Sequence, residues 1–127
     1  MSKILLNEDY YMGNEFDVKQ VVKLDNKVFV VLLLNKLKEN NLLDDSLMCK
    51  LTDSEYCKQN FKLAFEVLRE IASGQDERKA CFVSGHRRYY AKLKIETNSR
   101  KKCFVCNHWY EEQKELFANK VLRLLLK

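Results

Sequence analysis

The stretch from Tyr89 to Glu96 constrains the fold of this chain most, because apolar residues recur in it at every second position. A period of two that includes aromatic and β-branched residues is typical of a β-strand. Residues 97–100 follow with short polar side chains that can bond their own backbone, which favours a turn. A second strand is predicted over residues 101–106. Residues 87–109 are therefore expected to form a β-hairpin, and the basic hairpin unit of the domain is expected over 80–106.

Alternation along the first strand also predicts the register of this hairpin. Pairing across the turn sets Leu93 opposite Phe104 and Ala91 opposite Cys106. Since successive side chains of a strand point to opposite faces, these residues give the hairpin one apolar face. The other face is expected to carry lysines and to meet water.

Positive charge is concentrated on the predicted hairpin. Residues 87–102 hold seven Lys or Arg against one acid, a local balance of +6, while the whole chain carries +5. The seven cations are Arg87, Arg88, Lys92, Lys94, Arg100, Lys101 and Lys102. A basic hairpin with one apolar face is typical of a nucleic-acid-binding wing. It is also typical of an ordinary solvated hairpin, and the pattern leaves both interpretations open.

The two parts of the chain differ in charge. Residues 1–73 carry ten bases and twelve acids, a net charge of −2, whereas residues 74–127 carry thirteen bases and six acids, a net charge of +7. A basic region of this kind indicates an acidic partner, which could be nucleic acid or an acidic protein surface.

Length and composition limit the class of protein. A chain of 127 residues predicts a single domain, residues 1–127, with one core. No apolar run approaches the roughly 20 residues that span a bilayer, so no membrane partner is expected. The five cysteines form an odd set without a secretory signal. A reducing cytoplasm, bacterial or that of a phage host, is the expected location.

The first part of the chain is expected to be mostly helical. Residues 1–24 are poorly defined, with a turn at Tyr10–Gly13 and a short strand at Lys19–Leu24. Asp25 or Asn26 is expected to cap a central helix that runs to about Glu39, although a buried strand at 28–34 fits the same apolar run. A short helix is expected after residues 44–46.

The next segment shows capping patterns and an apolar stripe. Thr52 with Glu55 three residues later fits a capping box, which predicts another helix start. A break near Gln59 is expected to divide this segment, and a second helix is predicted over 61–72, with Gly74 as its stop. Residues 81–83 suggest a short strand. A last helix, capped by residue 107 or 108, is expected over about 109–126.

This order of short helices, hairpin and final helix is the layout of a winged helix-turn-helix. The runs LTDSEYCKQNFKLAFEVLRE, RRYY and KKCFVCNHWYEE resemble a small winged-helix-type module of bacterial and phage-borne proteins, over about residues 42–117. The matching positions are Leu51, Asp53, Tyr56, Cys57, Phe61, Leu68, Tyr89, Tyr90, Trp109 and Tyr110. The resemblance implies an α+β, winged-helix-like fold, mostly helical, with a two- or three-stranded antiparallel hairpin sheet.

Nucleic-acid contacts would then come from the second helix of the pair and from the hairpin. Phosphate contacts need flexible cations, and base reading needs Arg, Lys, Asn or Gln at the end of a helix. The helical candidates are Lys58, Gln59, Asn60, Lys62 and Arg69, and the hairpin candidates are the seven cations named above. Glu55, Glu66 and Glu70 on the same predicted helices would repel phosphate.

A metal site is the weaker hypothesis for the cysteines and histidines. Zinc needs four convergent ligands, which are usually paired in Cys-x2–4-Cys knuckles. The chain offers Cys81, His86, Cys103, Cys106 and His108. Cys103 and Cys106 would point to opposite faces of a strand, so the alternative is that these are free, buried cysteines. We therefore expect no metal and no cofactor.

Two functions remain open. No paired catalytic groups and no Gly-rich phosphate loop occur, so we expect no enzyme. The favoured function is a non-catalytic nucleic-acid-binding or regulatory module of a bacterium or phage. The alternative is a phage-type inhibitor of a host defence complex, similar to an anti-CRISPR protein, that acts by protein–protein contact. The partner would then be a host protein that itself binds nucleic acid.

Overall fold

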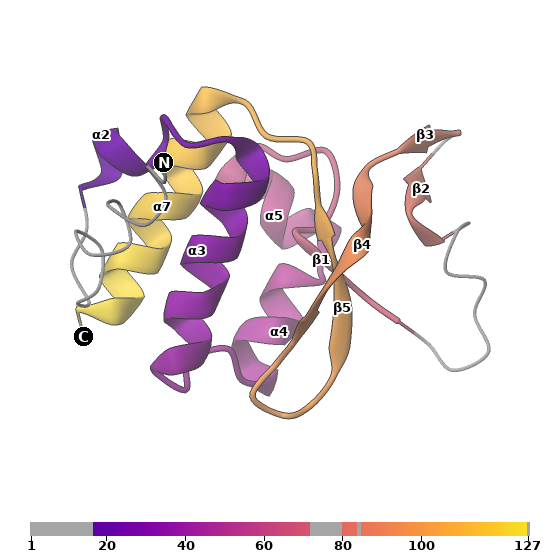
Figure 1. Cartoon of the computed structure of the whole chain (residues 1–127), viewed down its shortest axis with the longest axis horizontal. Coiled ribbons are helices and arrows are strands. Elements are labelled where there is room, and N and C mark those ends of the chain that lie inside the picture. Colours follow the sequence, from indigo (N-terminus) through magenta and orange to yellow (C-terminus); the bar gives the residue numbers. More distant parts are fainter. Residues whose placement is uncertain (1–16, 72–79, 84, 127) are drawn as a thin grey trace.

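The structure is a computed structural model in which residues 17–71, 80–83 and 85–126 are described. Helices come first along the chain, and strands and a final helix follow (Figure 1). The helices are α2 (Val18–Val21), α3 (Asn26–Glu39), α4 (Asp45–Leu51), α5 (Ser54–Phe61) and α7 (Glu111–Leu125). The strands are β1 (Leu68–Glu70), β2 (Phe82–Val83), β3 (His86–Arg87), β4 (Tyr89–Glu96) and β5 (Lys102–Cys106). The fold is α+β, as expected.

Helix α3 forms the centre of the helical layer. Phe29, Val30, Leu33, Leu34 and Leu37 are completely buried along it, which excludes the rival strand at 28–34. Two aromatic rings pack on α3, that of Phe117 within the last helix and that of Trp109 just before it. The ring of Phe29 lies 5.6 Å from that of Trp109 and 6.3 Å from that of Phe117. Burial of apolar surface on both helices therefore closes the core around α3.

Side-chain caps start the two short helices that follow. The carboxylate of Asp44 accepts a 3.0 Å hydrogen bond from the amide of Leu47 at the start of α4. Asp53 caps α5 in the same way, by accepting from the amide of Glu55 at 2.9 Å. The expected cap at Thr52 is wrong by one residue. Thr52 ends α4 instead, and its hydroxyl donates to the carbonyl of Met48.

The sheet has three antiparallel strands in the order β1-β5-β4, so β5 is central. One face packs on the helices and contributes Leu68, Ile95, Cys103 and Val105 to the main core. The other face joins a smaller core cluster of Phe65, Ala80, Cys81, Tyr89, Phe104 and Cys106. Figure 1 shows the helices on one side of this sheet and the separate β2–β3 ribbon on the other. The base of the hairpin is thus buried on both faces, not on one.

The predicted helix over residues 61–72 is wrong. Helix α5 ends at Phe61, because Lys62 takes a left-handed conformation with φ 60°. The chain then becomes extended, and β1 pairs with β5 through Leu68 opposite Val105. The residues 61, 63, 65 and 67 are buried while 62 and 64 are exposed, which is the period of a strand. Burial against β5 therefore decides the conformation of this segment.

The predicted hairpin register is wrong, by one residue near the turn and by two at the other end. Phe104 lies opposite Lys94, not Leu93, and Cys106 lies opposite Tyr89, not Ala91. An irregularity between Tyr89 and Lys94 shifts the pairing along β4. An extra residue in one strand displaces every later pair, and sequence alternation alone does not locate it. Lys94 and Glu96 nevertheless face solvent and Ile95 faces the core, as expected.

Three smaller expectations also differ from the structure. Residues 18–21 form helix α2, not a strand, and Asp17 caps it. Tyr110 is the cap of α7, in place of residue 107 or 108. The short strand predicted at 81–83 is confirmed as β2, paired with β3. The turn predicted at 10–13 and the stop predicted at residue 74 lie outside the described residues.

Candidate nucleic-acid interface

The turn that ends the basic hairpin is held against the helical layer. The amide of Asn98 donates to the carbonyl of Leu43 at 2.8 Å, and its side-chain amide donates to the carbonyl of Lys38 at 3.2 Å. The hydroxyl of Ser99 donates to the carboxylate of Asp45 at 2.6 Å. The tip therefore rests on the connection between α3 and α4 and is not a free-standing wing.

Bonds within the turn also fix its shape. Thr97 is buried, and its hydroxyl accepts from the amide of Lys101 at 3.1 Å. The amide of Arg100 donates to the carbonyl of Thr97 at 2.9 Å, and Arg100 has a left-handed φ of 66°. With the backbone tied down on both sides, the side chains of residues 100–102 lie exposed at the end of the hairpin.

One cation of the tip meets a carboxylate. The ammonium of Lys101 lies 3.6 Å from the carboxylate of Asp45, and both side chains are largely exposed. The hydrogen bond from Ser99 and then the charge of Lys101 hold the pKa of Asp45 below its usual value of 3.8. Solvent screens such exposed pairs strongly, so Lys101 keeps much of its attraction for other anions. Among the described residues, no carboxylate pairs with Arg100 or Lys102.

The helical candidates do not form a groove-reading helix, because the predicted helix over 61–72 does not exist. Lys58, Gln59 and Asn60 lie exposed on α5, where the side-chain amide of Asn60 donates to the carbonyl of Tyr56 at 2.9 Å. Lys62 follows the helix, and its ammonium lies 2.9 Å from the carboxylate of Glu112 on α7. Lys58, Gln59 and Asn60 remain available as surface contacts, on α5 and not on the hairpin tip.

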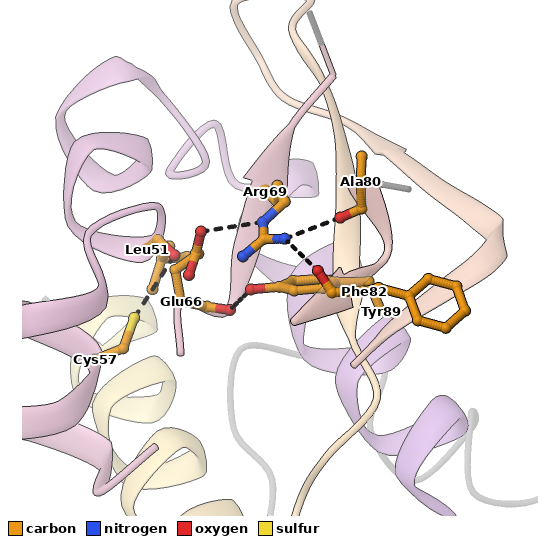
Figure 2. A network of polar contacts seen from close by, with 7 residues as sticks. All are labelled: Leu51, Cys57, Glu66, Arg69, Ala80, Phe82 and Tyr89. Carbon is orange, nitrogen blue, oxygen red and sulfur yellow. Dashed lines mark hydrogen bonds and ion pairs between the residues drawn. The ribbon is translucent and has the colours of Figure 1, made fainter. Parts of the chain in front are cut away.

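Arg69 makes several contacts within the fold (Figure 2). Its guanidinium pairs with the carboxylate of Glu66 at 3.2 Å and donates to the carbonyl of Ala80 at 2.9 Å and to that of Phe82 at 3.4 Å. It also lies over the ring of Tyr89, 4.5 Å from the ring centre. These partners use the Nε and Nη1 donors of Arg69, which makes it the least exposed of the predicted helical contacts.

The arginines before the hairpin lie at a different place. Arg87 is exposed on β3, and its guanidinium lies 5.4 Å from the ring centre of Phe82. Arg88 is half-buried and approaches the Nδ1 atom of His108 at 3.3 Å. Lys94 is exposed on β4. The backbone of Lys92 also lies in β4, while its side chain is outside the described part.

The cysteines and histidines do not converge on a metal site. Cys103 packs in the main core and Cys106 in the smaller cluster across the sheet. Cys81 is buried in that cluster, His86 is exposed on β3, and His108 is half-buried. In residues 17–71, 80–83 and 85–126, no group of three or more His, Cys, Asp or Glu is arranged to hold a metal ion.

The thiols of the sheet are held in their neutral form. Burial raises the pKa of Cys103 to about 11 and that of Cys106 to about 12. The thiolate is the form that binds metals and acts as a nucleophile. These cysteines therefore behave as small apolar groups of the core.

The structure thus brings Arg100, Lys101 and Lys102 together at one rigid tip and leaves the other candidates dispersed. Sequence reasoning missed Asn98 and Ser99 as anchors, because it read both as turn formers that bond only locally.

Comparison with protein-family models, with curated proteins and with solved structures finds no match for this chain. Among the described residues, no helix has the length and apolar character that a membrane span requires.

Proposed function

We propose that this chain is a non-catalytic nucleic-acid-binding module whose main phosphate contact is the hairpin tip. The observation that carries the proposal is the rigid presentation of three adjacent cations, Arg100, Lys101 and Lys102, on a turn anchored by Asn98 and Ser99. Cations on an ordered backbone lose little backbone freedom on binding, which favours affinity for a polyanion.

We also propose that the fold is of winged-helix type. Helices α4 and α5, joined by residues 52–53, and the three-stranded sheet with its hairpin support this assignment. The first turn of α5 carries acids, with Asp53 as its cap and Glu55 following. Since recognition helices usually approach the bases with their N-terminal end, these acids favour a phosphate contact through the hairpin over one through α5.

A salt titration of binding to short duplex DNA, followed by fluorescence anisotropy, tests the proposal. The triple variant Arg100→Gln, Lys101→Gln, Lys102→Gln removes three charges and keeps the side-chain stems. If each cation neutralises one phosphate, the slope of log affinity against log salt falls by about 2 to 3. The matched control removes three exposed cations elsewhere: Lys19→Gln, Lys23→Gln, Arg123→Gln. We expect the control to bind more tightly than the tip variant.

A second variant shifts affinity in the opposite direction. Asp45→Asn keeps an oxygen that accepts from Ser99 and removes the carboxylate beside Lys101. We expect binding about twofold tighter at low salt, since exposed pairs of this kind are weak. Equal binding by tip variant and control, or no binding at all, would contradict the proposal. A tight complex with a protein target and no DNA shift would favour the inhibitor alternative.

A further inference from the structure

Two segments distant in sequence lie side by side at the other end of the hairpin. The amide of Asn107 donates to the carbonyl of Arg88 at 2.8 Å, and its side-chain amide approaches the carbonyl of Arg87 at 3.5 Å. These bonds join residues 86–88 before β4 to residues 107–110 after β5. The contact between the guanidinium of Arg88 and Nδ1 of His108 brings side chains of the two segments together, separate from the turn at 97–100.

One aromatic ring stands exposed on this surface. Tyr110 is 63% exposed, more than the other large apolar residues of the described chain. Its amide donates to the side chain of Gln113 at 2.9 Å, and Gln113 in turn donates to the carbonyl of Lys62 at 3.0 Å. The ring also makes an edge contact with His108 at 4.9 Å. The position of Tyr110 is therefore fixed while much of its ring faces solvent.

Guanidinium groups lie between the aromatic rings. Arg88 contacts the Nδ1 atom of His108 at 3.3 Å and lies 5.8 Å from the ring of Phe65. Arg87 lies opposite Phe82 in the β2–β3 pair, 5.4 Å from its ring, and Phe82 is 39% exposed. Two cation–aromatic contacts thus occur at neighbouring residues, Arg87 with Phe82 and Arg88 with His108. We call these residues the aromatic strip: Phe82, Arg87, Arg88, His108 and Tyr110.

The charge balance of the strip favours an anion. Among the described residues, no carboxylate forms an ion pair with Arg87 or Arg88. Among the described residues, Glu111 and Glu112 follow Tyr110 in the first turn of α7, and Glu112 is paired with Lys62. Glu66, which follows Phe65, is paired with Arg69. The described part of the strip therefore carries two guanidinium groups without a paired carboxylate.

We propose that the aromatic strip binds single-stranded nucleic acid. An unpaired base stacks on the exposed ring of Tyr110 and another on Phe82, and the guanidinium of Arg87, beside Phe82, contacts a phosphate. Stacking on aromatic side chains combined with cations is the chemistry that recognises single strands without sequence preference. A duplex keeps its bases stacked on one another and cannot use these rings. The inference rests on the proposed function and names the substrate class.

The test compares a labelled oligothymidine strand with a short duplex, by fluorescence anisotropy on the full chain. Tyr110→Ser removes the ring and keeps a residue that can cap α7. We expect its affinity for the single strand to fall about tenfold, the effect of losing one stacked base, and its affinity for the duplex to stay the same. Tyr110→Phe is the matched control and retains single-strand binding.

A second probe separates stacking from charge. An abasic strand of equal length carries the phosphates but no bases. We expect the wild-type chain to prefer oligothymidine, and Tyr110→Ser to lose that preference. Upfield shifts of the Tyr110 ring protons on adding oligothymidine give an independent signature of stacking. Circular dichroism confirms that each variant is folded before its binding is compared.

The outcomes distinguish this inference from the proposed function. If the tip variant weakens duplex binding while Tyr110→Ser binds oligothymidine like the wild-type chain, the aromatic strip is overturned and the proposed function stands. If Tyr110→Ser weakens single strand and duplex equally, the strip is also overturned. If the wild-type chain binds neither, both proposals fail together.

Discussion

The hydroxyl of Tyr89 donates a 2.6 Å hydrogen bond to the main-chain carbonyl of Glu66, across the smaller core cluster. Tyr89 is completely buried, and the ring that carries this hydroxyl also supports the guanidinium of Arg69 (Figure 2). Tyr89 thus has two roles. Its hydroxyl satisfies the carbonyl of Glu66, and its ring orients Arg69, whose guanidinium donates to the carbonyls of Ala80 and Phe82. This contact links the sheet to the β2–β3 ribbon.

Removing the hydroxyl of Tyr89 is expected to destabilise the protein. Tyr89→Phe leaves the carbonyl of Glu66 without its partner in a buried setting, at a cost of about 1–2 kcal/mol in the free energy of unfolding. Urea denaturation measures this difference. Tyr110→Phe alters an exposed ring and is expected to change stability by less than about 0.5 kcal/mol. Equal stability of the two variants would show that the hydrogen bond of Tyr89 contributes nothing.

Arg69 is expected to be irreplaceable by lysine. A lysine lacks the planar donors that reach Glu66, Ala80 and Phe82 together, so Arg69→Lys should cost about 2–3 kcal/mol. Amide hydrogen exchange should accelerate at residues 82, 83 and 86–89. The control is Arg123→Lys, at an exposed position of α7. Unchanged exchange in the ribbon of Arg69→Lys would mean that other contacts hold it.

Stability is expected to fall at alkaline pH because buried thiols resist ionisation. Burial raises the pKa of Cys57 and Cys103 from 9.0 to about 11 and that of Cys106 to about 12. Each thiol binds its proton more tightly in the folded chain than in the unfolded chain. Its contribution to the free energy of unfolding is therefore complete below pH 9.0 and is lost as the pH rises toward the pKa of the thiol in the folded chain. The slope is up to about 1.4 kcal/mol per pH unit for each thiol.

A cysteine variant isolates this effect from the lysines. Burial lowers the pKa of Lys36 and of Lys114, which has the opposite sign and raises stability as the pH approaches 10.5. Cys106→Val leaves both lysines in place. Between about pH 8.5 and about pH 10, we expect the unfolding free energy of Cys106→Val to fall less steeply than that of the wild-type chain, by about 1 kcal/mol per unit. Parallel curves would contradict the assignment.

The left-handed conformation of Lys62 predicts a stabilising substitution. A side chain at φ 60° costs roughly 1 kcal/mol, and glycine avoids this cost at a helix end. Lys62→Gly should therefore stabilise the protein by about 0.5 kcal/mol, even though it loses the exposed ion pair to Glu112. Lys58→Gly removes a lysine within α5 and should cost about 1 kcal/mol. Thermal unfolding of the two variants should shift in opposite directions.

Local signals were enough to predict some elements from the sequence. The run after Asp25 contains enough apolar residues to bury a whole helix, and α3 has the expected bounds. Asp44 and the apolar residues after it predict α4 for the same reason. The hairpin followed from alternation at 89–96 and from turn residues at 97–100. In each case residues within the segment itself, an apolar run, a cap or turn residues, already indicate the element.

Long-range packing decided the elements that the sequence did not predict. Phe61 and Phe65 fit the apolar stripe of a helix. Together with Leu63 and Val67, however, they form a buried set at every second position, which is the period of a strand. Pairing of β1 with β5 selects the extended conformation. The continuous apolar run at Cys103–Cys106 was a further signal, because a strand without alternation is buried on both faces. No local pattern indicates that Asn98 reaches Leu43, so the anchored tip could not be foreseen.

The central strand of the sheet is also the last strand to be synthesised. Strand β5 lies between β1 and β4. During synthesis, the backbone groups of β1 that pair with β5 therefore have no partner until residues 102–106 are available. A nascent chain that stops before that point exposes the apolar side chains of residues 63–68 as an aggregation-prone edge. Translational pausing ahead of residue 102 would therefore lengthen the period in which this edge is exposed.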